Sequence, residues 1–169
     1  MAGGAIIPTL VLQGQWWRLI TYGFLHFNIV HILFNSYALF QAGVFVEYVY
    51  GSSRYAMIYT VALIGGGIAA YFYTIGTNDV TAGASGAIMG VFGAMGILAI
   101  KLPPLRRELG QAAIVPIILT LGYGFFNPNI SNAAHIGGVI CGAVMAALLT
   151  PARGQDMIRQ LRLGQNLEV

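Results

Sequence analysis

Residues 80–100 read VTAGASGAIMGVFGAMGILAI. This stretch contains no Asp, Glu, Lys or Arg, and a transmembrane helix needs about 20 predominantly apolar residues. It also holds a single serine, Ser85, which lies between Gly83 and Gly86 where the apolar run begins. The stretch therefore predicts a membrane-spanning helix with one polar side chain near its start.

The rest of the chain has the same character. Only 8 % of its residues are charged, against about 25 % in soluble domains, and the mean hydropathy is +0.76. This composition excludes an ordinary soluble enzyme and a disordered protein. It also excludes a nucleic-acid-binding protein, because eight scattered cations form no patch that follows a phosphate backbone. The single cysteine, Cys141, rules out an intrachain disulfide.

We predict an all-α membrane protein, a polytopic helical bundle with five transmembrane helices in a single domain over residues 1–169. Residues 1–15 are too short to span a membrane and lack the basic start of a signal peptide. A turn at Asn127-Pro128-Asn129 separates the last two spans. The spans are expected near 26–46, 55–75, 84–100, 111–126 and 132–150, followed by a cytoplasmic tail at 151–169.

The cations predict the orientation of these spans. With five spans, seven of the eight Lys and Arg residues fall on one side, and only Arg18 falls on the other. Cytoplasmic segments carry the excess of Lys and Arg, so the side with seven cations is the inner one. Trp16, Trp17 and Tyr22 would then belong to an aromatic belt at the outer interface.

The three histidines, His26, His31 and His135, all fall in the outer parts of predicted spans. Ionisable residues inside a membrane are candidates for function, although each histidine alone is equally well explained by a bond to a neighbouring carbonyl. His31 and Asn35 are four residues apart and share a helix face. They form either a polar contact between helices or a pair of donors aimed at one ligand atom.

Ser85 falls at the start of a predicted helix, where backbone N–H groups are unpaired and the helix dipole favours negative charge. A serine there could act as a nucleophile beside an oxyanion hole, and Gly83 and Gly86 would let a substrate backbone approach. Small residues four apart allow helices to pack closely. The glycines could serve helix packing alone, but if the third and fifth spans pack through them, Ser85 and His135 come near each other. The glycines concerned are Gly86, Gly90, Gly138 and Gly142.

The depth of the polar residues points to one site. Ser85, His135 and His31 each lie 16 residues from the inner end of their segment. At 1.5 Å per residue, each lies about 24 Å above the inner boundary of a hydrocarbon core about 30 Å thick. The inner ends are at Lys101, Pro151 and Glu47, respectively.

A serine and a histidine at one depth suggest acyl transfer, with Ser85 as nucleophile and His135 as general base. His31 and Asn35 would stabilise the oxyanion. The only acid on the outer side is Asp79, in a loop, so we expect a Ser–His dyad rather than a triad. Three histidines without an H-E-x-x-H motif or a buried carboxylate do not predict a metal site, and we expect no cofactor.

These motifs occur in a fixed order along the chain: Trp17-Arg18, His31-x-x-x-Asn35, Gly83-x-Ser85-Gly86 and Ala134-His135-x-x-Gly138-x-x-x-Gly142. In order and spacing they resemble the rhomboid family of intramembrane serine proteases, from about Trp16 to Leu149. The resemblance implies a Ser85–His135 dyad assisted by His31, Asn35 and Gly86, with His26 as a supporting histidine. It also implies a water-accessible cavity that opens outward.

The resemblance further implies substrates that are single-pass membrane proteins in the lipid bilayer, cut in or near the transmembrane helix. Residues 111–126 would then form a lateral gate and residues 127–131 a cap. We expect a bacterial or archaeal cell membrane, with the site open to the outer side; the sequence points to no oligomeric state. Two other readings are a non-catalytic relative that binds transmembrane helices and a small transporter.

Two features depart from the family pattern. The family core has six spans, and the span that would precede Trp17-Arg18 has no counterpart in residues 1–15. Met89, one turn after Ser85, stands where many members carry an aromatic side chain. Methionine also makes sulfur–aromatic contacts, so we expect this change to be tolerated.

Overall fold

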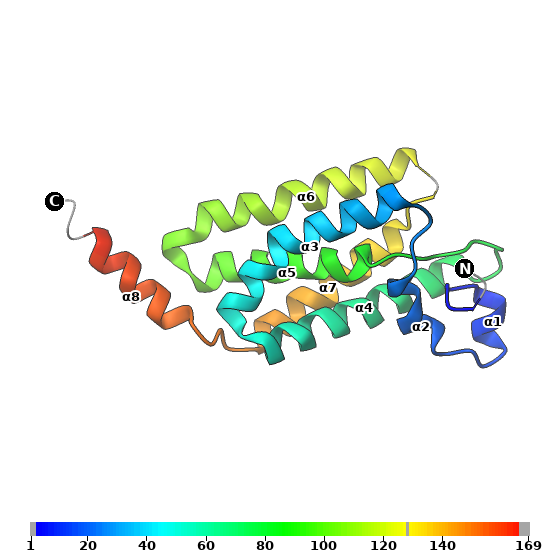
Figure 1. The fold of residues 1–169 in the computed structure, drawn as a ribbon, viewed down its shortest axis with the longest axis horizontal. Helices are drawn as coiled ribbons and strands as arrows, with labels where there is room; N and C mark the ends of the chain where they lie inside the picture. Colours follow the sequence, from blue (N-terminus) through cyan, green and yellow to red (C-terminus); the bar gives the residue numbers. More distant parts are fainter. Residues whose placement is uncertain (1–2, 128, 166–169) are drawn as a thin grey trace.

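The computed structural model describes residues 3–127 and 129–165 and is built almost wholly of helices (Figure 1). In this part of the chain there is no strand, only one antiparallel bridge between Ile6 and Thr81. Pro128 of the predicted turn and residues 166–169 of the predicted tail lie outside the described residues. The predicted all-α fold is confirmed.

The described residues form five long helices, which lie side by side along the long axis of the molecule (Figure 1). They begin and end within five residues of the predicted spans. The largest difference is at the start of α6, where the helix includes Arg106, Arg107 and Glu108 because it follows directly on a Pro-Pro turn. The five are α3 (Ile29–Tyr50), α4 (Ser52–Thr74), α5 (Ser85–Lys101), α6 (Arg106–Phe126) and α7 (Asn132–Leu148).

Local signals in the sequence set several of these helix ends. The Asn28 side chain accepts a hydrogen bond from the backbone N–H of His31 and so caps α3. Gly51, at a φ of +83°, separates α3 from α4, a conformation that favours glycine. Ser131 caps α7 by accepting from the N–H of Ala134. The two side-chain caps bond backbone N–H groups at the starts of α3 and α7, the helices that carry His31 and His135.

Helix α5 is the centre of the bundle. It packs against α3, α4, α6 and α7, and 12 of its 17 residues are buried. At 1.5 Å per residue, α5 is about 25 Å long, which is shorter than a hydrocarbon core of about 30 Å. Helices α3 and α4, and the stretch Pro103–Phe126, are each long and apolar enough to cross a membrane.

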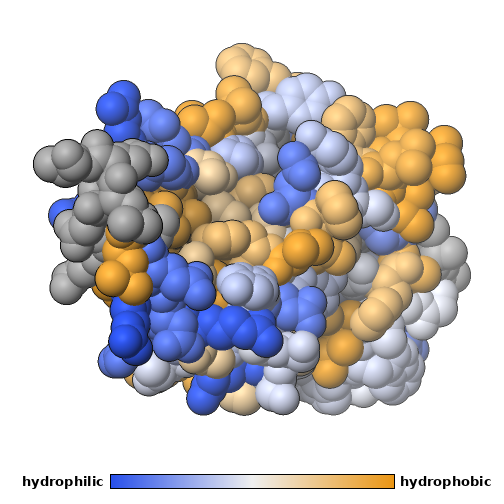
Figure 2. Space-filling view, turned by 60° about the vertical axis from the view of Figure 1, so that its left-hand side comes forward, coloured by the Kyte–Doolittle hydropathy of each residue, from blue (hydrophilic) through white to orange (hydrophobic). Residues whose placement is uncertain are grey.

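The outside of the bundle is apolar, as the lipid around a membrane protein requires. Large hydrophobic side chains on α3 and α6, such as Phe34, Phe40 and Leu119, are more than 60 % exposed. Hydrophobic residues cover much of the face in Figure 2, and hydrophilic residues gather toward the end that carries α8 (Gly154–Gln165). The molecule thus presents an apolar belt with a polar end.

The first residues of the described chain fold back over the opposite end of the bundle. Here lie α1 (Pro8–Leu12), α2 (Arg18–Thr21) and the 3-10 turn η1 (Tyr22–Phe24); a second such turn, η2 (Pro103–Leu105), precedes α6. Arg18 is buried and donates to the carbonyl of Ala5 at 2.7 Å and to the side chain of Gln15. Ile6 and Val11 are fully buried. This short segment is therefore part of the core.

The predicted aromatic belt is wrong at one position. Trp16 and Trp17 are 57 % and 53 % exposed, but Tyr22 is only 1 % exposed. Its hydroxyl donates to the carbonyl of Leu63 at 2.8 Å inside the bundle. A tyrosine whose hydroxyl has a buried partner can be buried completely, and that partner could not be foreseen from the sequence.

Candidate active site

Ser85 and His135 face each other between the two central helices. Ser85 is the first residue of α5, and His135 lies in the first turn of α7. The Ser85 Oγ atom is 2.8 Å from the His135 Nε2 atom. Ser85 is half-buried and His135 is 3 % exposed. A hydroxyl at hydrogen-bond distance from an imidazole nitrogen is the arrangement that nucleophilic catalysis by serine requires.

The other ring nitrogen of His135, Nδ1, is the atom that the acid of a catalytic triad would bind. Its Nδ1 atom is buried and has no hydrogen-bond partner among the described residues. Asp79 is exposed in the loop before α5, where its backbone N–H bonds to the Thr77 hydroxyl. In the described part of the chain, therefore, no carboxylate orients His135 as the acid of a triad would.

Glycines bring the two helices close enough for this contact. A Cβ atom added to Gly138 or Gly142 would collide with the backbone of Gly86 or Gly90, respectively, on α5. A Cβ atom at Gly90 would lie 2.8 Å from the carbonyl oxygen of Gly138. The small residues predicted to pack the third and fifth spans thus face one another along α5 and α7. Larger residues there would push His135 away from Ser85.

His31 and Asn35 on α3 lie on the other side of the loop that leads to Ser85. A Cβ atom at Gly83 would come within 2.8 Å of the His31 ring and 3.8 Å of the Asn35 Nδ2 atom. Asn35 is 9 % exposed, and within the described residues its Nδ2 atom has no acceptor. A buried amide donor without an acceptor is costly, so this donor is available to an oxygen atom brought in by a ligand.

His26 lies behind His31 rather than beside Ser85. Its ring meets the His31 ring edge-on, with centroids 5.0 Å apart, and the Phe27 ring stacks on the His31 ring with centroids 6.0 Å apart. These two side chains contact the His31 ring. Met89 is 2 % exposed and belongs to the main apolar core.

Tyr22 is a site residue that the sequence did not single out. Its carbonyl accepts a hydrogen bond from the N–H of Gly83 at 3.0 Å, and its hydroxyl holds α4 through Leu63. Two residues before Gly83, Thr81 pairs with Ile6 through backbone bonds of 2.9 and 3.0 Å. Backbone hydrogen bonds at Thr81 and at Gly83 therefore hold the loop before Ser85. No motif in the sequence predicts these bonds.

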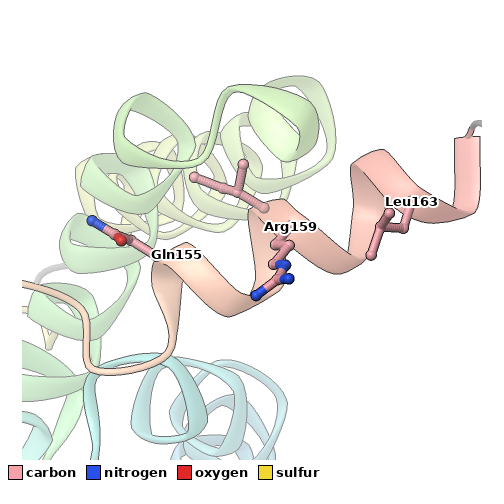
Figure 3. Close-up of a pocket in the computed structure, with 4 residues that line it drawn as sticks. Gln155, Arg159 and Leu163 are labelled. Carbon is pink, nitrogen blue, oxygen red and sulfur yellow. The ribbon is translucent and has the colours of Figure 1, made fainter.

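A surface pocket lies at the other end of the molecule. It is lined by Gln155, Ile158, Arg159 and Leu163 on α8 (Figure 3). Neither Ser85 nor His135 contributes to it. No group of three His, Cys, Asp or Glu side chains suited to a metal ion occurs in the part of the chain that the structure describes.

The amino-acid sequence of this chain is similar to those of known proteins. Residues 13–152 match the family model described as the Rhomboid domain. The chain is 44 % identical over 150 residues to rhomboid protease GluP of Bacillus subtilis (strain 168). It is 37 % identical over 174 residues to rhomboid protease AarA of Providencia stuartii. A putative rhomboid protease of Bacillus subtilis, YdcA, is 37 % identical over 144 residues.

These matches cover most of this chain but differing shares of the relatives. They include 88 %, 88 % and 82 % of the chain, in the same order. Of the relatives themselves, they include 29 % of GluP, 62 % of AarA and 69 % of YdcA. The chain thus spans less than two thirds of the length of the first two.

Proposed function

Since this chain belongs to the rhomboid family, we propose that it is an intramembrane serine endopeptidase that uses a Ser85–His135 dyad. The family and the apolar helices identify it as an integral membrane protein. The observation that carries the proposal is the distance of 2.8 Å between Ser85 Oγ and His135 Nε2. Three relatives named as proteases, one of them as putative, support the same class of reaction.

In the proposed reaction, Ser85 Oγ attacks the carbonyl carbon of a peptide bond while His135 Nε2 accepts the hydroxyl proton. The tetrahedral intermediate collapses to an acyl-enzyme, and His135 gives the proton to the leaving amine. A water molecule then attacks the ester with His135 again as base, which releases the new carboxylate and restores Ser85.

Donors around Ser85 would stabilise the negative oxygen of the intermediate. We assign this role to the Asn35 amide, the His31 ring and the backbone N–H groups at the start of α5, including that of Gly86. The unpaired Asn35 Nδ2 atom supports this assignment, because a donor set in place before the reaction needs no reorganisation as charge develops. His26 and Gly83 act on the position of His31 and the Ser85 loop.

We propose substrates that are single-pass membrane proteins, reached from within the bilayer. The exposed apolar surfaces of α3 and α6 support an approach from the lipid. We further propose that the site opens to the outer side of a bacterial or archaeal cell membrane, since most cations lie at the end with α8 and the loop before α6.

The first test is labelling of the purified protein with a fluorophosphonate probe in mild detergent, with the modified residue mapped by mass spectrometry. We expect labelling at Ser85, and its loss in Ser85→Ala and in His135→Ala. Turnover of a transmembrane peptide should fall more than about a thousandfold in both variants. Ser36→Ala, which removes an exposed serine from α3, is the matched control and should label normally.

Two results of this test would contradict the proposed Ser85–His135 dyad. If the folded wild-type protein does not react, or if Ser85→Ala still turns over substrate, the dyad is not the catalytic group. Absence of all reaction would favour a non-catalytic family member that binds transmembrane helices.

A further inference from the structure

A second pocket lies between α8 and the end of α3, and we call it the α3–α8 pocket. Its lining includes Tyr48 from α3, Arg153 from the segment before α8, and Asp156, Arg159 and Leu163 from α8. Its volume is about 460 Å³, which is within the range of sites that hold small ligands. Arg159 also lines the neighbouring pocket in Figure 3. Two arginines and one carboxylate therefore share a pocket at the end of the bundle opposite the candidate dyad.

Arg153 is already held in place in this pocket. Its backbone N–H donates to the carbonyl of Val49 at 3.0 Å. Its Nη1 atom donates to the carbonyl of Tyr48 at 2.7 Å, and its Cζ atom lies 4.8 Å from the centroid of the Tyr48 ring. A guanidinium has five N–H donors, so most of them remain for a ligand. A side chain that is held before binding loses little freedom when a ligand arrives.

Arg159 has no partner of this kind. It is exposed, and among the described residues its side chain makes no hydrogen bond or ion pair. Asp156 lines the same pocket but forms no ion pair with either arginine in the described structure. Two cations and one acid leave the pocket with a net charge of +1. Guanidinium groups match the geometry of a phosphate, so the pocket is suited to an anion that carries one.

The pocket also lies where an apolar stripe on α3 ends. Tyr37, Phe40, Val44 and Tyr48 are each more than half exposed, and they recur every three or four residues, so they share one face of the helix. At 1.5 Å per residue this stripe is about 17 Å long, close to half of a hydrocarbon core of about 30 Å. Because Tyr48 belongs to both the stripe and the pocket, an acyl chain along the stripe places its phosphate beside Arg153.

We propose that the α3–α8 pocket binds an anionic phospholipid with one net negative charge. The phosphate lies between Arg153 and Arg159, a headgroup hydroxyl donates to Asp156, and an acyl chain follows the stripe on α3. Such a lipid neutralises the net charge of the pocket, whereas a zwitterionic lipid leaves it at +1. The site is separate from Ser85 and His135, and this inference goes beyond the proposed protease activity.

The test is native mass spectrometry of the whole protein in detergent, with phosphatidylglycerol or phosphatidylethanolamine added. Both headgroups have donors for Asp156, so the comparison isolates their net charge. We expect phosphatidylglycerol to bind roughly fivefold more tightly, as one additional charge near a membrane surface implies. Arg159→Gln should remove this preference, and Arg159→Lys should keep it. Arg107→Gln removes an exposed cation from α6 that does not line the pocket, and it should keep both the affinity and the preference.

The acyl chain is tested separately from the phosphate. Glycerophosphoglycerol, the same headgroup without acyl chains, should not displace the lipid at equal concentration. Phe40→Ser should weaken binding of phosphatidylglycerol roughly two- to tenfold through lost apolar contact. Phe72→Ser makes the same change at an equally exposed position on α4 and should leave binding unchanged.

Three results would overturn the proposal. They are equal binding of the two lipids by the wild-type protein, an equal loss of preference in Arg107→Gln and Arg159→Gln, and displacement of the lipid by glycerophosphoglycerol. The last result would identify a site for free phosphate esters instead. Arg159→Gln removes no described contact, so its effect on binding cannot come from a lost fold. Ser85→Ala should bind lipid like the wild type, which separates this inference from the proposed function.

Discussion

At the residue scale, the candidate site depends on Gly83, which has no side chain, as much as on Ser85 and His135. Gly83 has a φ of +133°, and the His31 ring occupies the space that a Cβ atom would take. The Tyr22 carbonyl accepts its N–H. These contacts fix the loop two residues before Ser85, so the direction of the hydroxyl is set by the backbone.

Gly83→Ala is therefore expected to lower turnover by roughly ten- to a hundredfold, because backbone strain of this kind costs about 1–3 kcal/mol. The His31 collision adds to this cost. Gly76→Ala is the matched control, since Gly76 also has a positive φ but nothing within 4 Å of its Cβ position. Equal effects of the two substitutions on kcat would show that the His31 contact is unimportant.

Tyr22→Phe keeps the buried ring but removes the hydroxyl that bonds to Leu63. The Leu63 carbonyl keeps its donor within α4 but loses the Tyr22 hydroxyl, a hydrogen bond that contributes about 0.5–1.5 kcal/mol. We expect the midpoint of thermal unfolding in detergent to fall by several degrees. Tyr73→Phe, at a tyrosine that is 78 % exposed, should leave the midpoint unchanged; a similar drop in both variants would contradict this role for Tyr22.

These residues also show how far the sequence could predict the site. Ser85 and His135 stand out because polar residues are rare in apolar segments, and their equal depth suggests that they meet. Tyr22 does not stand out, because its role depends on a backbone carbonyl contact that any residue type could make. Its hydroxyl partner, Leu63, is an ordinary apolar residue of α4.

At the scale of single elements, the C-terminal end of α7 has an unusual cap. Lys101, the last residue of α5, donates from Nζ to the carbonyls of Ala146, Ala147 and Leu149 at 2.6–2.9 Å. These carbonyls belong to the last turn of α7 and to its C-cap Leu149, where a cation also complements the helix dipole. The Tyr50 hydroxyl donates to the Ala146 carbonyl as well.

Lys101→Met should therefore destabilise the protein by roughly 1.5–3 kcal/mol, the cost of losing hydrogen bonds from a charged donor. The loss should appear in thermal unfolding and as faster hydrogen exchange at the end of α7. Arg107→Met removes an exposed cation from the first turn of α6 and should change neither. If the two variants behave alike, the three contacts of Lys101 contribute nothing.

The helices themselves could be predicted better than the segment before them. Long charge-free runs place α3 to α7 because lipid requires apolar side chains. Residues 3–15 are also charge-free, but they are too few to span a membrane and show no clear period. Their structure depends on distant partners, such as Thr81 for Ile6, so sequence patterns could not predict that they pack over the end of the bundle opposite α8.

At the scale of the whole molecule, the proposed orientation can be measured directly. In a Cys141→Ala background, Asn78→Cys lies in the loop before Ser85, and Arg107→Cys lies at the start of α6; both positions are exposed. We expect a membrane-impermeant maleimide to label Asn78→Cys on intact bacterial cells and Arg107→Cys only after lysis. Labelling in the reverse order would contradict the orientation that the cations predict.

The separation of the proposed dyad along the chain has a consequence for biosynthesis. Ser85 and His135 are 50 residues apart, and ribosomes add about 5–20 residues per second. For roughly 3–10 s, each nascent chain therefore carries the serine without its base. Under the proposed mechanism, it cannot cleave the other proteins that are being inserted beside it until α7 has entered the membrane.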